Sequence, residues 1–170
     1  MSLLQHPIFV LDTNVLIEAH RRYYSLDLCP GFWECLIHFC GESRVRSIDR
    51  VRKEIREGDG LDAWVKQAPS GFFASTADRE VINCFQEIMS WIQSSDQYKP
   101  EARSSFANIA DGWVVAYARA YDGIVVSHEA YRPNRKSSIP IPNICRQFSV
   151  PYEDTFSMLR ALEVRFNWTR

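Results

Sequence analysis

The sequence has no long apolar run ahead of its first acidic residue. The longest uninterrupted run before Asp12 extends from Ile8 to Leu11, which is too short for a signal peptide or a membrane span. We therefore expect a cytoplasmic protein that does not enter a membrane. The sequence also lacks a glycine-rich phosphate loop, an internal repeat and a low-complexity tract. These absences exclude the glycine-rich nucleotide-binding motifs and the repeat architectures.

Paired cysteines and a strong net charge are missing as well. The five cysteines are an odd number and include no CxxC pair, which fits neither a disulfide framework nor a zinc site. They are most simply explained as reduced thiols. The formal net charge is −1, so bulk electrostatics do not indicate a nucleic-acid-binding protein, and any attraction for phosphate must be local.

The composition is that of a folded domain. The chain has 170 residues, of which 46% are hydrophobic and 13% aromatic, enough for one well-buried core and against disorder. We predict a single domain over residues 1–170 that includes a C-terminal closing segment at 139–170.

The most informative stretch is IFVLDTNVLIEAHRR, residues 8–22. Its short apolar run predicts a buried, parallel strand, and the apolar spacing after Asn14 predicts a helix. Asp12 then lies at the carboxyl end of a strand, the edge where open α/β sheets bind ligands. The alternative is that Asp12, Thr13 or Asn14 only caps the helix.

Apolar periodicity predicts the other elements of the chain. The polar residues 94–105, which contain Pro100, predict an exposed connection. Two prolines within 139–144 limit that stretch to an edge or extended segment. Further helices are expected at 32–40, 49–56, 61–66, from Thr76 or Asp78 to Ile92, at 108–121 from an Asn108 cap, and within 152–166 after Pro151, with Asp154 or Thr155 as cap. Strands are expected at 45–48 and 124–127.

Four carboxylates stand out by their position: Asp12, Glu54, Asp111 and Glu129. Asp12 and Glu129 follow predicted strands, Glu54 lies on a charged helix, and Asp111 lies in the first turn of a helix. If the two strands are neighbours, the acids converge, and clustered carboxylates persist at neutral pH mainly when a cation neutralises them. Oxygen ligands suit Mg²⁺ or Mn²⁺. The chemistry that needs such a site is metal-assisted phosphodiester hydrolysis.

The segments VLDTNVLIEA, VRKEI, ADGWVVAYA and IVVSHE, in this order and spacing, resemble the four acidic motifs of the PIN-domain family of metal-dependent nucleases. The tail PIPNICRQFSVPYEDTFSMLRAL further resembles an uncharacterised PIN-like subfamily with a proline-rich strand and a closing helix. The resemblance implies an α/β fold, a three-layer α/β/α sandwich with a central, mostly parallel sheet.

The same resemblance assigns roles to the acids. It implies that Asp12, Glu54 and Asp111 are catalytic residues that hold one or two Mg²⁺ or Mn²⁺ ions, with Glu129 as the fourth acid, binding directly or through water. The departure is at Glu129, where the widest family pattern has Asp, and the extra methylene changes the reach of the carboxylate.

Polar and aromatic neighbours of the acids receive supporting roles. The resemblance implies that Thr13, Asn14 and Ser127 orient the carboxylates by hydrogen bonds. Trp113 is expected to pack in the core rather than to stack on a base. Two basic segments are candidates for nucleic-acid binding, with a solvated surface as the alternative. Their residues are Arg50, Arg52, Lys53, Arg132, Arg135 and Lys136.

The function implied is that of a divalent-metal-dependent endoribonuclease, the toxin of a toxin–antitoxin pair. Its partners are then an RNA substrate and a cognate antitoxin protein, with a homodimer as an open question. The alternative is a PIN-like domain without catalysis that binds RNA or a protein. A phosphatase with Asp12 as nucleophile is less well supported, because the haloacid-dehalogenase pattern needs an acid where Asn14 stands. A purely structural α/β domain does not explain the repeated acids.

Overall fold

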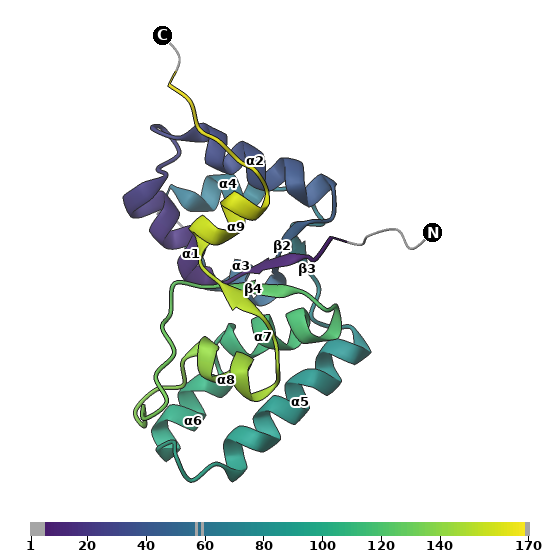
Figure 1. Ribbon diagram of the computed structural model, residues 1–170, viewed down its shortest axis with the longest axis vertical. Coiled ribbons are helices and arrows are strands. Elements are labelled where there is room, and N and C mark those ends of the chain that lie inside the picture. The colour runs from purple at the N-terminus through teal and green to yellow at the C-terminus, as the bar shows by residue number, and fades with distance from the viewer. Residues whose placement is uncertain (1–5, 57, 59, 169–170) are drawn as a thin grey trace.

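A five-stranded sheet lies at the centre of the computed structural model, which describes residues 6–56, 58 and 60–168 (Figure 1). The strand order is β3-β2-β1-β4-β5, and every strand pairing is parallel. The strands are β1 (Phe9–Leu11), β2 (Val45–Ile48), β3 (Phe73–Ala74), β4 (Ile124–Val126) and β5 (Tyr152–Glu153).

The order of the strands places a change of direction at the middle of the sheet. From β1 the chain adds β2 and then β3 on one side, and later adds β4 and β5 on the other. β1 and β4 are therefore neighbours, and Val10 pairs with Val125. Both strands are short, apolar and almost wholly buried, as expected for strands covered on two faces. The crevice beyond their carboxyl ends is where open α/β sheets bind ligands.

Helices cover both faces of the sheet and complete a three-layer α/β/α sandwich (Figure 1). In the figure α1, α2, α4 and α9 lie on one side and α5, α6, α7 and α8 on the other. The predicted fold class is confirmed. The helices are α1 (Thr13–Glu18), the π-helical η1 (Ala19–Tyr23), α2 (Pro30–Gly41), α3 (Asp49–Glu54), α4 (Leu61–Gln67), α5 (Arg79–Ser94), α6 (Pro100–Ala107), α7 (Asp111–Ala120), α8 (Ile141–Gln147) and α9 (Thr155–Ala161).

The two long helices of the second layer show why the apolar pattern succeeded there. α5 carries Val81, Ile88 and Ile92 at helical spacing, and all three are fully buried. It packs against α7, whose residues 114–118 are buried without interruption. α7 lies between α5 and the sheet and buries most of its surface, so its sequence is apolar nearly all round. Among the described residues, no helix has both the length and the apolar character that a membrane crossing requires.

Two proline-containing segments are helical where the sequence predicted otherwise. The exposed connection expected at 94–105 contains α6, and the edge or extended segment expected at 139–144 contains the start of α8. Pro100 and Ile141 are the first residues of these helices. Proline is well tolerated in a first helical turn, where no intrahelical N–H bond is lost. Both predictions were wrong because these prolines lie at the starts of helices, where proline is tolerated.

The true edge strand lies further along the chain. The closing helix was expected within 152–166 with Asp154 or Thr155 as its cap. The Asp154 cap is confirmed, whereas the preceding Tyr152 and Glu153 form β5, which pairs with β4. α9 begins only at Thr155, after the cap residue Asp154, whose Oδ1 accepts a 2.7 Å hydrogen bond from the Ser157 amide. The two-residue strand is too short to produce a period that sequence analysis could recognise.

Gly123 lies directly before β4, where the backbone closely approaches the residue that precedes β1. A Cβ at Gly123 would lie 2.8 Å from the carbonyl oxygen of Ile8, which accepts the amide hydrogen bond of Ile124. The oxygen is part of the backbone and cannot move aside cheaply. We therefore expect Gly123→Ala to lower the free energy of unfolding by about 1–3 kcal/mol, the usual cost of overpacking, measured by urea unfolding.

Gly41 supplies the matched control for that substitution. It ends α2, and a Cβ there would have no atom within 4 Å. Gly41→Ala should leave the urea midpoint unchanged or raise it slightly, because alanine favours helix. Equal stability of the two variants would contradict a close contact between Gly123 and β1.

Candidate active site

The four predicted acids meet around the carboxyl edge of the sheet. Asp12 follows β1 and Glu129 follows β4, while Glu54 ends α3 and Asp111 begins α7. Glu54 links two of these positions, since it accepts hydrogen bonds from the residue after Asp12 and the residue before Asp111. The sheet thus brings together acids that are up to 117 residues apart in the sequence, at the point where the strand order changes direction.

Asp12 is buried and only half satisfied. Its side chain is 1% exposed, and its Oδ2 accepts a 3.2 Å hydrogen bond from the hydroxyl of Ser127. Its other oxygen, Oδ1, is buried and has no hydrogen-bond partner among the described residues. Leaving a buried carboxylate oxygen without a partner is costly. An oxygen in that condition is suited to accept a proton or to bind a cation.

Glu54 differs from Asp12 because both of its carboxylate oxygens are used. Oε2 accepts a hydrogen bond from the Thr13 hydroxyl, and Oε1 accepts one of 2.7 Å from the Ala110 amide. Ala110 is the N-cap of α7, so Glu54 fixes the start of that helix to α3.

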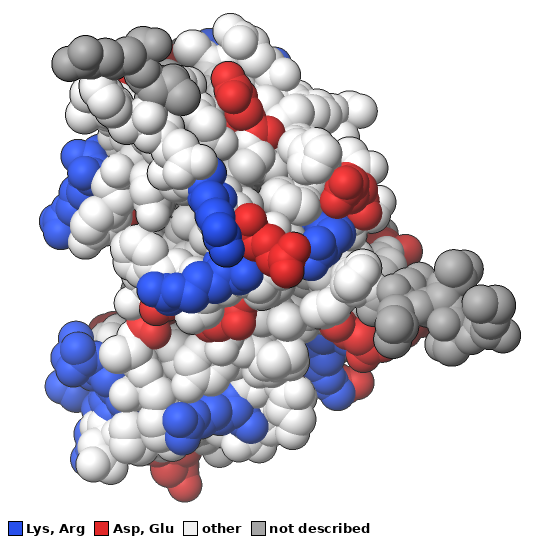
Figure 2. Space-filling model, turned by 45° about the horizontal axis from the view of Figure 1, so that its top comes forward, with Lys and Arg blue, Asp and Glu red and all other residues white. Residues whose placement is uncertain are grey.

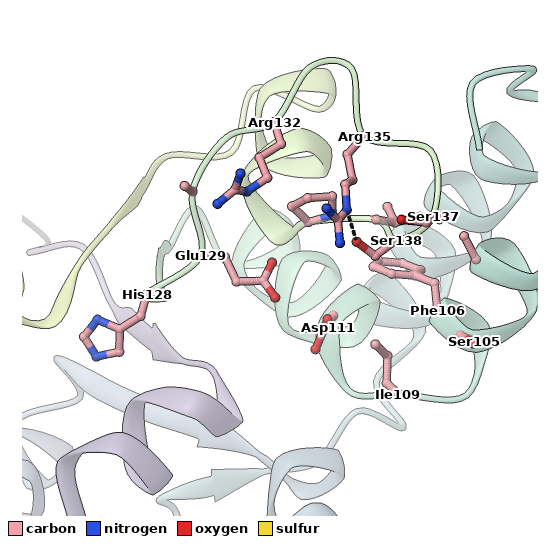
Figure 3. A pocket seen from close by; sticks show the side chains of 14 residues that line it. Ser105, Phe106, Ile109, Asp111, His128, Glu129, Arg132, Arg135, Ser137 and Ser138 are labelled. Carbon is pink, nitrogen blue, oxygen red and sulfur yellow. Dashed lines mark hydrogen bonds between the residues drawn. The ribbon is translucent and has the colours of Figure 1, made fainter. Parts of the chain in front are cut away.

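Asp111 and Glu129 line a cavity of about 680 Å³ (Figure 3). The Glu129 Oε2 atom accepts a 2.7 Å hydrogen bond from the amide of Ile141, the first residue of α8. The Glu129 amide donates to the hydroxyl of Ser127, which also holds Asp12. Arg132 and Arg135 extend over the same cavity from the loop that follows Glu129.

The proximity of the acids raises the pKa of two of them. Burial first, and then the negative charge of Glu129, raise the pKa of Asp12 to about 7. Burial and the charge of Asp12, followed by that of Glu129 and Glu54, raise the pKa of Asp111 to about 8. Without a neutralising partner, the pair therefore resists ionisation at neutral pH.

The donor set fits a hard divalent cation in its chemistry. All four side chains offer oxygen, the ligand that Mg²⁺ and Mn²⁺ prefer, and the free Oδ1 of Asp12 and the mutual repulsion with Asp111 would both be relieved by a positive charge. Among the described residues, however, no group of three or more His, Cys, Asp and Glu side chains is close enough to hold a metal ion directly. Mg²⁺ usually retains several waters, so a cation here would be held partly through water.

The residues expected to orient the acids fall into two groups. Thr13 and Ser127 are buried and donate hydrogen bonds to Glu54 and Asp12 respectively. Asn14 is exposed on α1, and its side chain makes no hydrogen bond among the described residues. The strand-end position alone did not separate Thr13 from Asn14, because neighbouring residues in a first helical turn point in different directions.

The basic residues also divide by position. Arg50 and Lys53 line a second cavity, of about 340 Å³, that also contacts Glu54. Arg52, on the same helix, lies over the ring of Phe73 at 5.9 Å. In the space-filling view, basic side chains lie on both sides of a hollow across the middle of the molecule, with acidic side chains inside it (Figure 2). Arg132 and Arg135 belong to the first cavity, and Lys136 does not line either one.

Sequence analysis missed Asn143, which holds the basic loop in place. Its buried side chain accepts a 3.0 Å hydrogen bond from the Arg132 amide and donates one of 2.9 Å to the Arg132 carbonyl oxygen. A further bond of 3.2 Å joins it to the hydroxyl of Tyr98. The only sign in the sequence was one polar residue within the apolar string IPNIC.

His128 is a second site residue that sequence analysis did not select. It lines the first cavity (Figure 3), and its Nε2 lies 3.1 Å from the hydroxyl of Thr155 at the start of α9. Its position between Ser127 and Glu129, at a strand end, was the available signal.

The raised pKa values predict how stability depends on pH without metal. A carboxyl group with a higher pKa in the folded protein binds protons more readily when folded, so its contribution to the free energy of unfolding is lost as pH rises through that pKa. For Asp111 this interval extends from 3.8 to about 8. We expect Asp111→Asn to melt at the wild-type temperature near pH 4 and at least about 2–4 °C higher at pH 9 in EDTA.

The difference between variant and wild type isolates Asp111 from the other carboxylates. The pKa values of Asp62 and Asp154 are lowered, so their contribution to the free energy of unfolding increases as pH rises. Both residues are present in the variant and in the wild type, so this contribution cancels in the difference. A melting difference that does not grow between pH 4 and pH 9 would contradict the repulsion described here.

A family described as "Domain of unknown function (DUF4411)" matches residues 9–166. Among solved structures, the VapBC2 complex from Rickettsia felis, bound to a DNA fragment from its promoter, contains a chain with 10% identity and a TM-score of 0.49, covering 86% of this chain and 98% of that one. FitAcB from Neisseria gonorrhoeae gives 14% identity and a TM-score of 0.49, with 85% and 96% covered. No curated protein matches the sequence.

Proposed function

The chain belongs to the family described as "Domain of unknown function (DUF4411)", a description that gives no activity, and we propose from the site itself that it is a divalent-metal-dependent endoribonuclease. The observation that carries the proposal is the buried, unpartnered Oδ1 of Asp12. It lies among mutually repelling carboxylates at the change of direction of a parallel sheet, beside a cavity with two arginines.

The carboxylates and Ser127 have different roles in the proposed site. Asp12, Asp111 and Glu129 would hold one or two cations, with Glu54 as a further ligand or a support of the site. A divalent cation held by these carboxylates would supply Lewis-acid chemistry, activating water and neutralising charge that develops on the phosphoryl group. Ser127 keeps Oδ2 of Asp12 in place. The carboxylates position the reaction and do not themselves attack the phosphorus.

The arginines of the first cavity supply the attraction for the substrate. Arg132 and Arg135 extend over the cavity that Asp111 and Glu129 line (Figure 3). One guanidinium group can bind two oxygens of a phosphate at once. Asn143 fixes the backbone of Arg132. A phosphodiester bound by the arginines would therefore lie next to the acids despite the net charge of −1.

The resemblance of the acidic motifs to PIN-domain nucleases supports a more specific role. We propose that the enzyme is the toxin of a toxin–antitoxin pair, with RNA as substrate and a cognate antitoxin protein as partner. A homodimer is compatible with this role. The support for it is the order and spacing of the four motifs in the sequence.

Asp12→Asn and Asp111→Asn should each lower RNA cleavage at least about 100-fold, because even the supports of metal ligands commonly contribute 10–100-fold to metal affinity or activity. Neither variant should lose the fold, since each substitution removes a repelling charge. Cleavage of total cellular RNA in Mg²⁺ or Mn²⁺ measures the effect, and growth arrest on induced expression, relieved in both variants, measures the toxin role.

Asp96→Asn is the control for a lost carboxylate, because Asp96 is exposed and lines neither cavity. It should cleave RNA and arrest growth like the wild type. Full cleavage by Asp12→Asn or Asp111→Asn would refute the proposed site.

A specific observation favours a second candidate function, that of a nucleic-acid- or protein-binding domain without catalysis. Both oxygens of Glu54 and one oxygen of Glu129 already accept hydrogen bonds. Calorimetric titration with Mn²⁺ separates the two functions. The nuclease should bind Mn²⁺ at micromolar to millimolar concentration and lose binding in Asp12→Asn, whereas no heat of binding at millimolar Mn²⁺ would favour the second function.

The basic loop generates a prediction for binding that does not depend on catalysis. Each lysine or arginine that contacts a phosphate of single-stranded nucleic acid contributes about 0.7 to the slope of log affinity against log salt. Replacing both Arg132 and Arg135 by alanine should therefore lower that slope by about 1.4 in EDTA, measured by anisotropy of a labelled RNA oligomer. Arg165→Ala, at an exposed position outside both cavities, should leave the slope unchanged, and an equal change in both proteins would show that the loop makes no specific contact.

A further inference from the structure

The second cavity is lined by Arg50 and Trp113, whose contact the proposed chemistry does not use. The guanidinium of Arg50 lies 4.5 Å from the ring centroid of Trp113. Phe85 is stacked on the same indole with centroids 3.7 Å apart and an angle of 10° between the planes. Trp113 is partly buried and packs against the core, as predicted in part, and Arg50 is exposed.

The guanidinium of Arg50 is held in position from below. Its Nε donates a 3.2 Å hydrogen bond to the hydroxyl of Thr76, which in turn donates one of 2.8 Å to Oδ1 of Asp49. Thr76 is only 2% exposed. Arginine on a surface normally samples many rotamers, whereas here a hydrogen bond and a contact with the indole restrain the guanidinium. A ligand that stacks on its plane therefore meets a side chain that is already ordered.

The other groups of the cavity suit a nucleotide. Lys53 brings a second positive charge. The Nδ2 atom of Asn108 donates a 2.8 Å hydrogen bond to the Ser104 carbonyl, which leaves the amide oxygen of Asn108 as an acceptor for the edge of a base. Glu54 joins this cavity to the acidic cluster. A volume of about 340 Å³ is in the range of small-molecule sites.

We propose that this cavity binds one unpaired nucleotide next to the cleavage site, with its base stacked on the guanidinium of Arg50 and its phosphate at Lys53. Bases stack well on arginine planes, and only an unpaired base exposes its face in this way. The substrate strand is then single-stranded at that position. The inference rests on the nucleic-acid-binding part of the proposed function and not on catalysis.

The test separates stacking from charge. Binding of a fluorescein-labelled eight-nucleotide oligoadenylate RNA is followed by anisotropy in EDTA, so that no cleavage occurs. Arg50→Lys keeps the charge but loses the plane, and should weaken binding at least about fivefold, the lower end of what one stacked base contributes. Arg52→Lys is the matched control on the same helix, because Arg52 lies over Phe73 outside the cavity. It should bind within about twofold of the wild type.

A second arm uses only the wild-type protein, so it does not depend on how a variant folds. AMP and dAMP should displace the oligomer at lower concentration than ribose 5-phosphate, which carries the same phosphate but no base. Displacement by AMP alone would indicate that the sugar is also recognised, and displacement by both would indicate that the site accepts ribose and deoxyribose.

The inference is overturned if ribose 5-phosphate competes as well as AMP, if Arg50→Lys and Arg52→Lys have equal effects, or if the wild type does not bind the oligomer. Failure of the proposed nuclease is scored separately, by the cleavage assay and the Mn²⁺ titration. If the protein cleaves RNA but Arg50→Lys leaves oligomer binding unchanged, this inference fails and the proposed nuclease function stands.

Discussion

The repulsion between buried carboxylates is the constraint on which the site depends. Asp12 is 1% exposed and Asp111 is close enough for the charge of Asp12 to raise its pKa. A fold that evolved only for stability would replace such a pair by apolar residues, because uncompensated buried charge is costly. The hydroxyl of Ser127 offsets part of that cost at Asp12, and the oxygen of Asp12 that is left free can bind a cation. The arginines line the same cavity as Asp111.

The acids come in two physical kinds. Glu54 and Glu129 are tied to the backbone of neighbouring helices, at Ala110 and Ile141, so they are structural members of the site as well as charges. Asp12 and Asp111 carry the raised pKa values. The aspartates are the acids whose ionisation is suppressed, and the longer glutamates hydrogen-bond to the backbone of the surrounding helices.

The sequence predicted the sheet and the acids better than it predicted the rim of the site. Strands such as β1 and β4 are continuous apolar runs that end in polar residues, so both their existence and the positions of Asp12 and Glu129 were visible. The helical state of α8 was not, because a proline in a first turn and a proline in an edge strand look alike without the neighbouring chain. The stack of Arg50 on Trp113 joins residues that are 63 positions apart, and no periodicity within either helix records such a contact.

Glu129 shows how one methylene changes the organisation of the site. The motif resemblance leads one to expect aspartate there, and the longer side chain places Oε2 at the amide of Ile141, 2.7 Å away. Ile141 begins α8. Two residues later the same helix carries Asn143, whose side chain makes two hydrogen bonds with the backbone of Arg132. The fourth acid and the basic loop are therefore joined through one turn of helix. A shorter acid at this position would lie closer to the sheet and leave that turn without its anchor, so the glutamate couples the charge that repels phosphate to the arginine that attracts it.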